Sequence, residues 1–244
     1  IMKKGICCIC GEYKELTFEH IPPNKAFNYC RAKSIEGAEL LKLITEKNRM
    51  PWETDGLKYV SKQRGMGIYS LCEKCNNITD SYYGTEYLKF ANTIDMLFPQ
   101  IISNNTKNNN NVANIIIHDM NPLLFAKQVL SMFCSTCPNI TKMDPTIKDL
   151  LLNKEKKGLN QSKYKLSMFL LNEHKISYTG YQVMHISGLG IRKIATIDAY
   201  PFGFVLEFDP IQNLKSPELD ITSFFNDYDC TEYKMEFGIP VLER

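Results

Sequence analysis

Four cysteines near the start of the chain form two Cys-x-x-Cys pairs, Cys7 with Cys10 and Cys72 with Cys75. A two-residue spacer lets one tight turn present two thiolates to the same ion, and two such pairs complete the tetrahedron that zinc prefers. Cys8 stands too close to Cys10 for this geometry. We therefore expect a structural Zn²⁺ on Cys7, Cys10, Cys72 and Cys75; the alternative is a group of buried free thiols without metal.

Glu19 and His20 stand side by side between the two cysteine pairs. Neighbouring side chains of an extended segment point to opposite faces, so the two can perform separate tasks. A carboxylate can hold a divalent cation through oxygen, and an imidazole can take a proton from a water molecule that attacks phosphorus. An isolated histidine is more often a hydrogen-bonded structural residue, but the flanking cysteine pairs favour the chemical role.

Asn76 follows the last of these cysteines without a gap. Its amide oxygen is a suitable ligand for Mg²⁺ or Mn²⁺, and at the opening of a helix it would face the strand that carries Glu19. Asn77, one residue later, would point elsewhere. The alternative is that Asn76 or Asn77 serves only as a helix cap.

The order Cys-x-x-Cys, acid-His, Cys-x-x-Cys-Asn resembles the HNH, or ββα-metal, endonucleases, and is most similar to the recombination endonuclease VII type. The resemblance extends to about residue 92. It implies a treble-clef fold in which the four cysteines bind zinc, Glu19 and Asn76 hold a catalytic Mg²⁺ or Mn²⁺, and His20 is the general base. The chain departs from the family in three respects: Glu19 replaces the usual aspartate, no histidine follows in the helix, and Gly67 and Ile68 occupy the region of the middle asparagine.

Hydrophobic periodicity and turn residues predict the elements that must position these side chains. Helices are expected over residues 36–47 and 76–91, and behind Asn121-Pro122 and Asp144-Pro145, where Asn or Asp caps the helix and Pro takes its first position. A short helix is expected after Asp220. Strands are expected at residues 57–60, 112–117, 164–171, 182–186, 193–199, 203–208 and 233–237.

This order of elements predicts an α+β fold with two domains. An N-terminal zinc-stabilised ββα-metal domain is expected over residues 1–100, and a C-terminal α+β domain with an antiparallel sheet over residues 112–244. Residues 104–111 read Asn-Asn-Thr-Lys-Asn-Asn-Asn-Asn, and we expect this low-complexity stretch to be a loop at the boundary.

Net charge and cysteine content limit which partners and which cellular compartment the sequence favours. The 29 Lys and Arg residues against 27 Asp and Glu leave a net charge of only +2, so overall charge does not point to nucleic acid. The basic side chains expected to contact the phosphates of a nucleic acid are Lys25, Arg31, Lys33, Arg49, Lys62 and Arg64. Nine cysteines, four of them in metal-type pairs, favour a reducing compartment. With no signal peptide and no apolar run of eighteen residues, we expect a cytoplasmic protein without a membrane partner.

Other polar residues are expected to have structural roles. Cys134 and Cys137 have metal spacing, but they end an apolar helix without a second pair nearby, so a buried thiol pair is expected. The remaining histidines and three strand acids are isolated, and the acids are expected to face solvent: His118, His174, His185, Asp198, Glu207 and Asp209.

The sequence supports two hypotheses of different class. The first is a metal-dependent endonuclease that hydrolyses phosphodiester bonds, with DNA as the favoured substrate and phage defence as a role suggested by the type of nuclease alone. The second is a catalytically inactive zinc-finger module that binds nucleic acid or a protein partner. The C-terminal domain could form a homodimer, bind a regulatory protein or contact the substrate, and the sequence does not choose among these.

Overall fold

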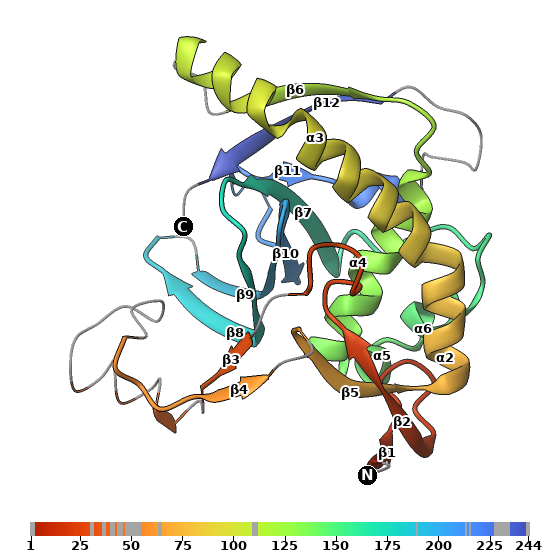
Figure 1. Cartoon of the computed structure of the whole chain (residues 1–244). Helices are drawn as coiled ribbons and strands as arrows, with labels where there is room; N and C mark the ends of the chain where they lie inside the picture. The colour runs from red at the N-terminus through yellow and green to blue at the C-terminus, as the bar shows by residue number, and fades with distance from the viewer. Residues whose placement is uncertain are drawn as a thin grey trace.

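The structure is a computed structural model (Figure 1). It describes residues 3–242 apart from 30–31, 36–37, 40–41, 43–45, 47–54, 63–64, 109–111, 189, 213, 215 and 227–234. Most of the helix expected over residues 36–47 lies outside this part. Within it, no helix is long and apolar enough to cross a membrane.

The first unit is a three-stranded sheet followed by a helical run, and it contains the ββα sequence β2, β5 and α2. An antiparallel sheet has the order β1-β2-β5, formed by β1 (Lys3–Ile6), β2 (Tyr13–His20) and β5 (Gly67–Cys72). The helical run that follows comprises α2 (Glu73–Thr79), a π-helical segment η1 (Asp80–Gly84) and α3 (Thr85–Asn108). A separate hairpin pairs β3 (Ala32–Ser34) with β4 (Val60–Lys62). The expected ββα arrangement is therefore present.

The second half supplies a seven-stranded sheet and three helices. The strand order is β6-β12-β7-β10-β9-β8, with β11 also paired to β7. The pairs are antiparallel except β12 with β7, which is parallel. The strands are β6 (Val112–Ile117), β7 (Tyr164–Leu171), β8 (Ile176–Ile186), β9 (Gly190–Ala199), β10 (Phe202–Phe208), β11 (Leu219–Asp220) and β12 (Met235–Leu242). The helices are α4 (Pro122–Thr136), α5 (Ile140–Met143) and α6 (Pro145–Leu152), and a 3₁₀ turn η2 (Thr222–Phe225) follows β11. The α+β fold class is confirmed.

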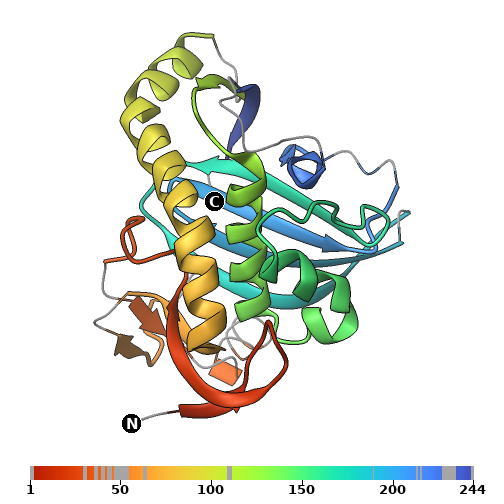
Figure 2. The ribbon, with the colours of Figure 1, turned by 90° about the vertical axis from the view of Figure 1, so that its right-hand side faces the viewer.

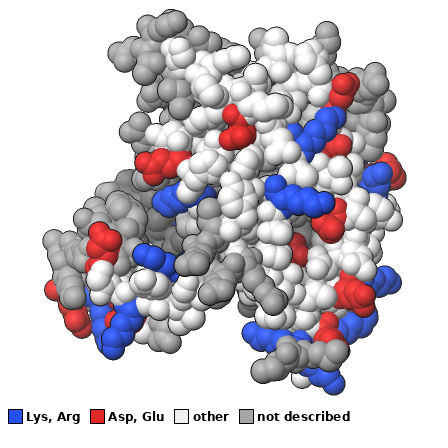
Figure 3. Space-filling view, viewed as in Figure 1, with Lys and Arg blue, Asp and Glu red and all other residues white. Residues whose placement is uncertain are grey.

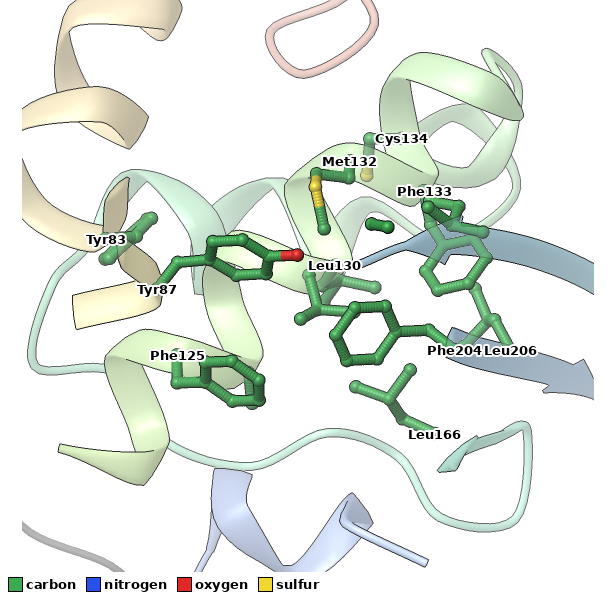
Figure 4. Packing of buried hydrophobic residues seen from close by; sticks show 14 of the residues in the cluster. Tyr83, Tyr87, Phe125, Leu130, Met132, Phe133, Cys134, Leu166, Phe204 and Leu206 are labelled. Carbon is green, nitrogen blue, oxygen red and sulfur yellow. The ribbon is translucent and has the colours of Figure 1, made fainter. Parts of the chain in front are cut away.

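Helix α4 joins the two halves. It lies beside α3 over one face of the large sheet (Figure 2) and contacts β5, η1 and α6 as well as strand β8. Because it has neighbours on all sides, it is apolar around most of its circumference and nearly all its residues are buried. Figure 4 shows the resulting core, in which Tyr87 stacks on Phe125 with ring centroids 5.6 Å apart, and Phe125 in turn contacts Phe204 of β10. A single buried cluster thus contains residues from both halves.

Local sequence signals explain several helix starts. The Asn121 side chain accepts a hydrogen bond from the Leu124 N–H at 3.1 Å, and Asp144 accepts one from the Thr146 N–H at 3.1 Å, with Pro next in each case. Both predicted helix starts are confirmed.

Helix α2 starts earlier than expected, and this bears on Asn76. The helix begins at Glu73, with Cys72 in extended conformation as its N-cap residue. A carboxylate at the first position suits the positive end of the helix dipole. Asn76 therefore lies within the helix, and the alternative in which Asn76 or Asn77 is the cap is wrong.

Two further boundaries differ from expectation. Helix α3 continues to Asn108, so it enters the Asn-rich stretch that was expected to be a loop. Each residue added to a helix that is already formed and packed gains a hydrogen bond at little cost, which explains the extension. Strand β4 begins at Val60 rather than at residue 57, because its register is set by pairing with β3.

The strand acids do not all face solvent. Asp198 and Glu207 are buried at 4% and 2% exposure, and only Asp209 is exposed. Arg192 pairs with both carboxylate oxygens of Glu207, at 2.8 and 3.1 Å, and Lys175 lies 3.6 Å from Asp198. The expectation of solvent-facing acids is wrong at these two positions because each has a cationic partner on a neighbouring segment.

Candidate metal centre and adjoining pocket

The four predicted zinc ligands come together at the end of the small sheet. One sulfur from each of Cys7, Cys10, Cys72 and Cys75 lies within 4.8 Å of every other. The sulfurs of Cys10 and Cys72 are 3.9 Å apart, close to the separation of about 3.8 Å that tetrahedral Zn–S bonds of about 2.3 Å require. Among the described residues this is the group of acids, cysteines and histidines with the geometry of a metal site.

Local backbone structure holds the four sulfurs. Gly11 has φ +76°, which a residue with a side chain adopts poorly, and its N–H donates to the Cys7 carbonyl to close the first turn. The Cys72 N–H donates to the sulfur of Cys7 at 3.3 Å. A hydrogen bond from the thiol of Cys75 lowers the pKa of Cys7 below its usual value. Four cysteine sulfurs within 4.8 Å of one another are the donor set of a structural zinc site.

A pocket of about 500 Å³ adjoins this centre. It lies against the end of β2, helix α2, the π-helical segment and the start of α3. Its lining is mostly polar and comprises Phe18, Glu19, His20, Pro23, Asn24, Lys25, Asn76, Asn77, Asp80, Ser81, Gly84, Thr85, Leu88 and Gln128. The predicted residues Glu19, His20 and Asn76 are thus in one place, together with Lys25.

Glu19 is the buried carboxylate of the pocket. It is 7% exposed and lies on β2 opposite Ile68. Burial, and next the negative charge of Asp80, raise the pKa of Glu19 to about 8. Both causes disfavour the ionised form of Glu19, and a cation bound near Glu19 and Asp80 would favour it.

The orientation of the Asn76 amide follows from a chain of hydrogen bonds. The Thr17 hydroxyl donates to the Leu71 carbonyl at 2.9 Å, so its oxygen acts as acceptor toward Asn76. The Asn76 amino group donates to that oxygen at 3.0 Å. The amide oxygen therefore points away from Thr17, and it is this oxygen that would bind a hard cation.

His20 is half-buried at the end of β2, across the sheet from Gly67. The ring of Phe18 meets the imidazole edge to face, with centroids 5.0 Å apart. A side chain at residue 67 is excluded, because a Cβ there would lie 2.3 Å from the carbonyl oxygen of Glu19 and 2.7 Å from the Phe18 ring. The region expected to hold the middle asparagine thus has room only for glycine at residue 67.

Asp80 is one of the polar pocket residues that the sequence did not reveal. Asp80 lies four residues after Asn76 on the same helical run, a spacing that places both on one face and could have revealed it. Gly84 leaves room for Asp80, since a Cβ at residue 84 would lie 3.1 Å from its carboxylate. The π-helical geometry of this segment is itself frequent at functional sites.

Gln128 is a further missed residue, and it comes from α4 in the second half. It lines the pocket yet is only 2% exposed, and its side-chain oxygen has no hydrogen-bond partner within the described part of the chain. An unpaired buried acceptor is costly, so such groups often mark a place where a ligand supplies the donor. A polar residue within an apolar helix was the only sequence signal.

The rim of the pocket is held by Asn28. Its amide donates to the carbonyls of Pro22 and Met66 at 2.6 and 2.7 Å and accepts from the Met66 N–H at 2.7 Å. These bonds fix the loop that carries Lys25 against the start of β5. Sequence spacing gave no sign of this role.

Of the other predicted phosphate-binding residues, Lys33 has a described side chain, and it does not line the pocket. Lys33 lies on the separate β3-β4 hairpin, with its ammonium 4.6 Å from the ring centre of Tyr59. The side chains of the remaining four lie outside the described part: Arg31, Arg49, Lys62 and Arg64. Figure 3 shows basic and acidic side chains interspersed on the face it presents.

The residues expected to be structural can also be placed. Cys134 and Cys137 are buried at the end of α4, as expected. His174 stacks on Tyr200 at 3.9 Å, and the Tyr200 hydroxyl donates to Asp95 at 2.6 Å.

No protein-family model matches this chain, and no curated protein or solved structure is significantly similar to it. The geometry of the site is therefore the basis for assigning a function.

Proposed function

We propose that this chain is a metal-dependent endonuclease of HNH type that hydrolyses phosphodiester bonds, with DNA as the favoured substrate. The observation that carries the proposal is the pocket beside the four-cysteine centre. A buried carboxylate, a half-buried imidazole and an oriented amide line one polar pocket of about 500 Å³. Zn²⁺ on the four cysteines would hold β5 and α2 in place, and so fix the positions of Glu19 and Asn76.

Each residue has a role that follows from its surroundings. Glu19 and Asn76 supply the hard oxygen ligands for Mg²⁺ or Mn²⁺, and Asp80 adds negative charge from the facing helix. A divalent cation bound there stabilises negative charge on the phosphate and the leaving oxygen. His20 accepts the proton of the attacking water, and the Phe18 ring restricts the rotation of its imidazole. Lys25 meets the phosphate from the rim.

Plasmid nicking with Mg²⁺ or Mn²⁺ tests the proposal. His20→Ala should lower the cleavage rate by about 100-fold or more, the usual contribution of a general base, while zinc content and fold stay unchanged. Glu19→Gln and Asn76→Ala should instead raise the divalent-metal concentration needed for half-maximal rate, and Asn77→Ala should have a milder effect. A wild-type protein that cleaves no nucleic acid with either metal, or a fully active His20→Ala, would refute the assignment.

One observation favours a second function, a zinc module that binds without cleaving. Gly67 stands opposite His20 and contributes no side chain to orient it. If the Phe18 contact does not replace that support, the site would bind nucleic acid or a protein without hydrolysis. Binding without cleavage, unaffected by His20→Ala, would favour this alternative.

A further inference from the structure

A row of aromatic rings leads from the pocket across the small sheet. Phe18 contacts His20 at the pocket and also meets Tyr69 edge to face, with centroids 5.3 Å apart. The ammonium of Lys3 lies 5.7 Å from the centre of the Tyr69 ring. The order from the pocket outward is therefore His20, Phe18, Tyr69 and Lys3.

A β-bulge is what places these side chains on one face. The pairing of β2 with β5 shifts register between Thr17 and Phe18, so that Phe18 lies opposite Tyr69. The extra residue on β5 is Ser70, which has no partner on β2, and its hydroxyl donates a hydrogen bond to the hydroxyl of Ser135 on α4. Bulges re-aim side chains next to functional sites, and this one turns Tyr69 toward the same face as Phe18.

The exposure of the row increases with distance from the pocket. Phe18 and His20 are half-buried, Tyr69 is 38% exposed and Lys3 is exposed. Proteins commonly bind an unpaired nucleotide through an exposed aromatic ring and a nearby basic side chain. The base stacks on the ring, and the basic side chain contacts the phosphate. At 5.7 Å the contact of Lys3 with the ring is near the outer limit for a cation–π pair, so a base can displace it.

The charge distribution favours a single strand over a duplex. A duplex is held mainly by many phosphate contacts, whereas a single strand gains much of its binding energy from stacking. In the described part of the chain, the basic residues of the pocket and the aromatic row are Lys25 and Lys3. Among the described residues, the face drawn in Figure 3 carries basic and acidic side chains interspersed.

We propose that the row formed by Phe18, Tyr69 and Lys3 binds the unpaired strand of a DNA substrate as it leaves the pocket, with one base stacked on Tyr69 and the adjoining phosphate at Lys3. This proposal rests on the proposed nuclease function. It narrows the substrate to DNA with a single-stranded segment next to the cleaved bond.

Fluorescence anisotropy with the full chain tests this surface. The probes are a labelled single-stranded 20-nucleotide DNA, the matching duplex and the matching RNA, without added divalent cation so that no cleavage occurs. We expect the single-stranded DNA to bind more tightly than the duplex. Tyr69→Ala should weaken that binding about tenfold, and Tyr69→Phe should retain it, because stacking needs the ring and not the hydroxyl. Lys3→Ala should reduce the dependence of the single-strand binding constant on salt concentration by the amount expected for about one phosphate contact.

Tyr13→Ala is the matched control. Tyr13 is 71% exposed and pairs with Ile6, whereas Lys3 pairs with Leu16, so Tyr13 lies on the opposite face of the same sheet. It should bind the single strand as the wild type does. Equal binding by Tyr69→Ala and wild type, tighter binding of the duplex or the RNA, or no binding of any probe would overturn the proposal. If Tyr69→Ala cleaves duplex DNA as the wild type does, this inference alone would be overturned. If binding depends on the Tyr69 ring but no metal supports cleavage, the nuclease function alone would be overturned.

Discussion

Replacing Gln128 by methionine should raise the stability of the protein and lower its activity. The buried side-chain oxygen of Gln128 has no hydrogen-bond partner in the described part of the chain, and an unsatisfied buried acceptor costs about 1–3 kcal/mol. Gln128→Met keeps similar length and similar helix propensity while removing the polar group. The ligand-free protein should therefore gain about 1 kcal/mol or more, which for a chain of this size corresponds to a rise in melting temperature of roughly 2–4 °C.

The same substitution should impair the site. If the oxygen accepts a hydrogen bond from the bound substrate or from a water held with it, Gln128→Met removes an interaction worth about a factor of ten in kcat/KM. Plasmid nicking under the conditions above measures this loss, and differential scanning fluorimetry without added divalent cation measures the stability.

Ser131→Ala is the control for these measurements. Ser131 lies three residues further along α4, is buried at 1% exposure and likewise has an oxygen without a partner among the described residues, but it does not line the pocket. It should be neutral or stabilising and should leave cleavage unchanged. A Gln128→Met protein that is less stable than the wild type, or equally active, would show that the oxygen is satisfied by another group or plays no part in the site.

Three further outcomes are expected. Zinc should co-purify at about one equivalent, and Cys72→Ser should unfold the N-terminal unit because metal binding is coupled to folding there; metal analysis and circular dichroism check this. Gly84→Ala should leave the helix intact but displace Asp80, so the metal concentration for half-maximal cleavage should rise without loss of melting temperature. Burial opposes ionisation of Asp144, but hydrogen bonds from Thr146 and the charge of Lys163 outweigh it and lower the pKa of Asp144. The ionised Asp144 stabilises the fold at pH values above the pKa that it has in the unfolded chain, and this stabilisation is lost as pH falls through its lower folded pKa. Asp144→Ala should therefore lower the free energy of unfolding by about 1 kcal/mol near pH 7 and by less below about pH 4, as measured in acid titrations of unfolding.

The zinc ligands and the helix caps were predictable because their signals are local. Cys-x-x-Cys spacing fixes which sulfurs share a turn, and Asn-Pro or Asp-Pro fixes where a helix begins. Glu19 and His20 lie on β2, which pairs with β5, and Asn76 lies on α2, which directly follows β5. This arrangement brings the three side chains to one pocket.

What escaped prediction depends on contacts distant in sequence. Gln128 meets the pocket only because α4 packs against η1 and β5. The buried state of Glu207 depends on Arg192 of the neighbouring strand. The bulge that aligns Phe18 with Tyr69 was not predictable either, because the residue that it leaves without a partner on β2, Ser70, forms a hydrogen bond to Ser135 of α4, which is distant in sequence.

The burial of α4 on all sides also limits how this site can be moved between proteins. A fragment ending near residue 100 would keep the four cysteines and Glu19 but would lose the wall that contains Gln128. It would also uncover Tyr83 and Tyr87, which are fully buried in the full chain. We therefore expect that transferring this site to another protein would require α4 and the sheet on which it rests, in addition to the first hundred residues.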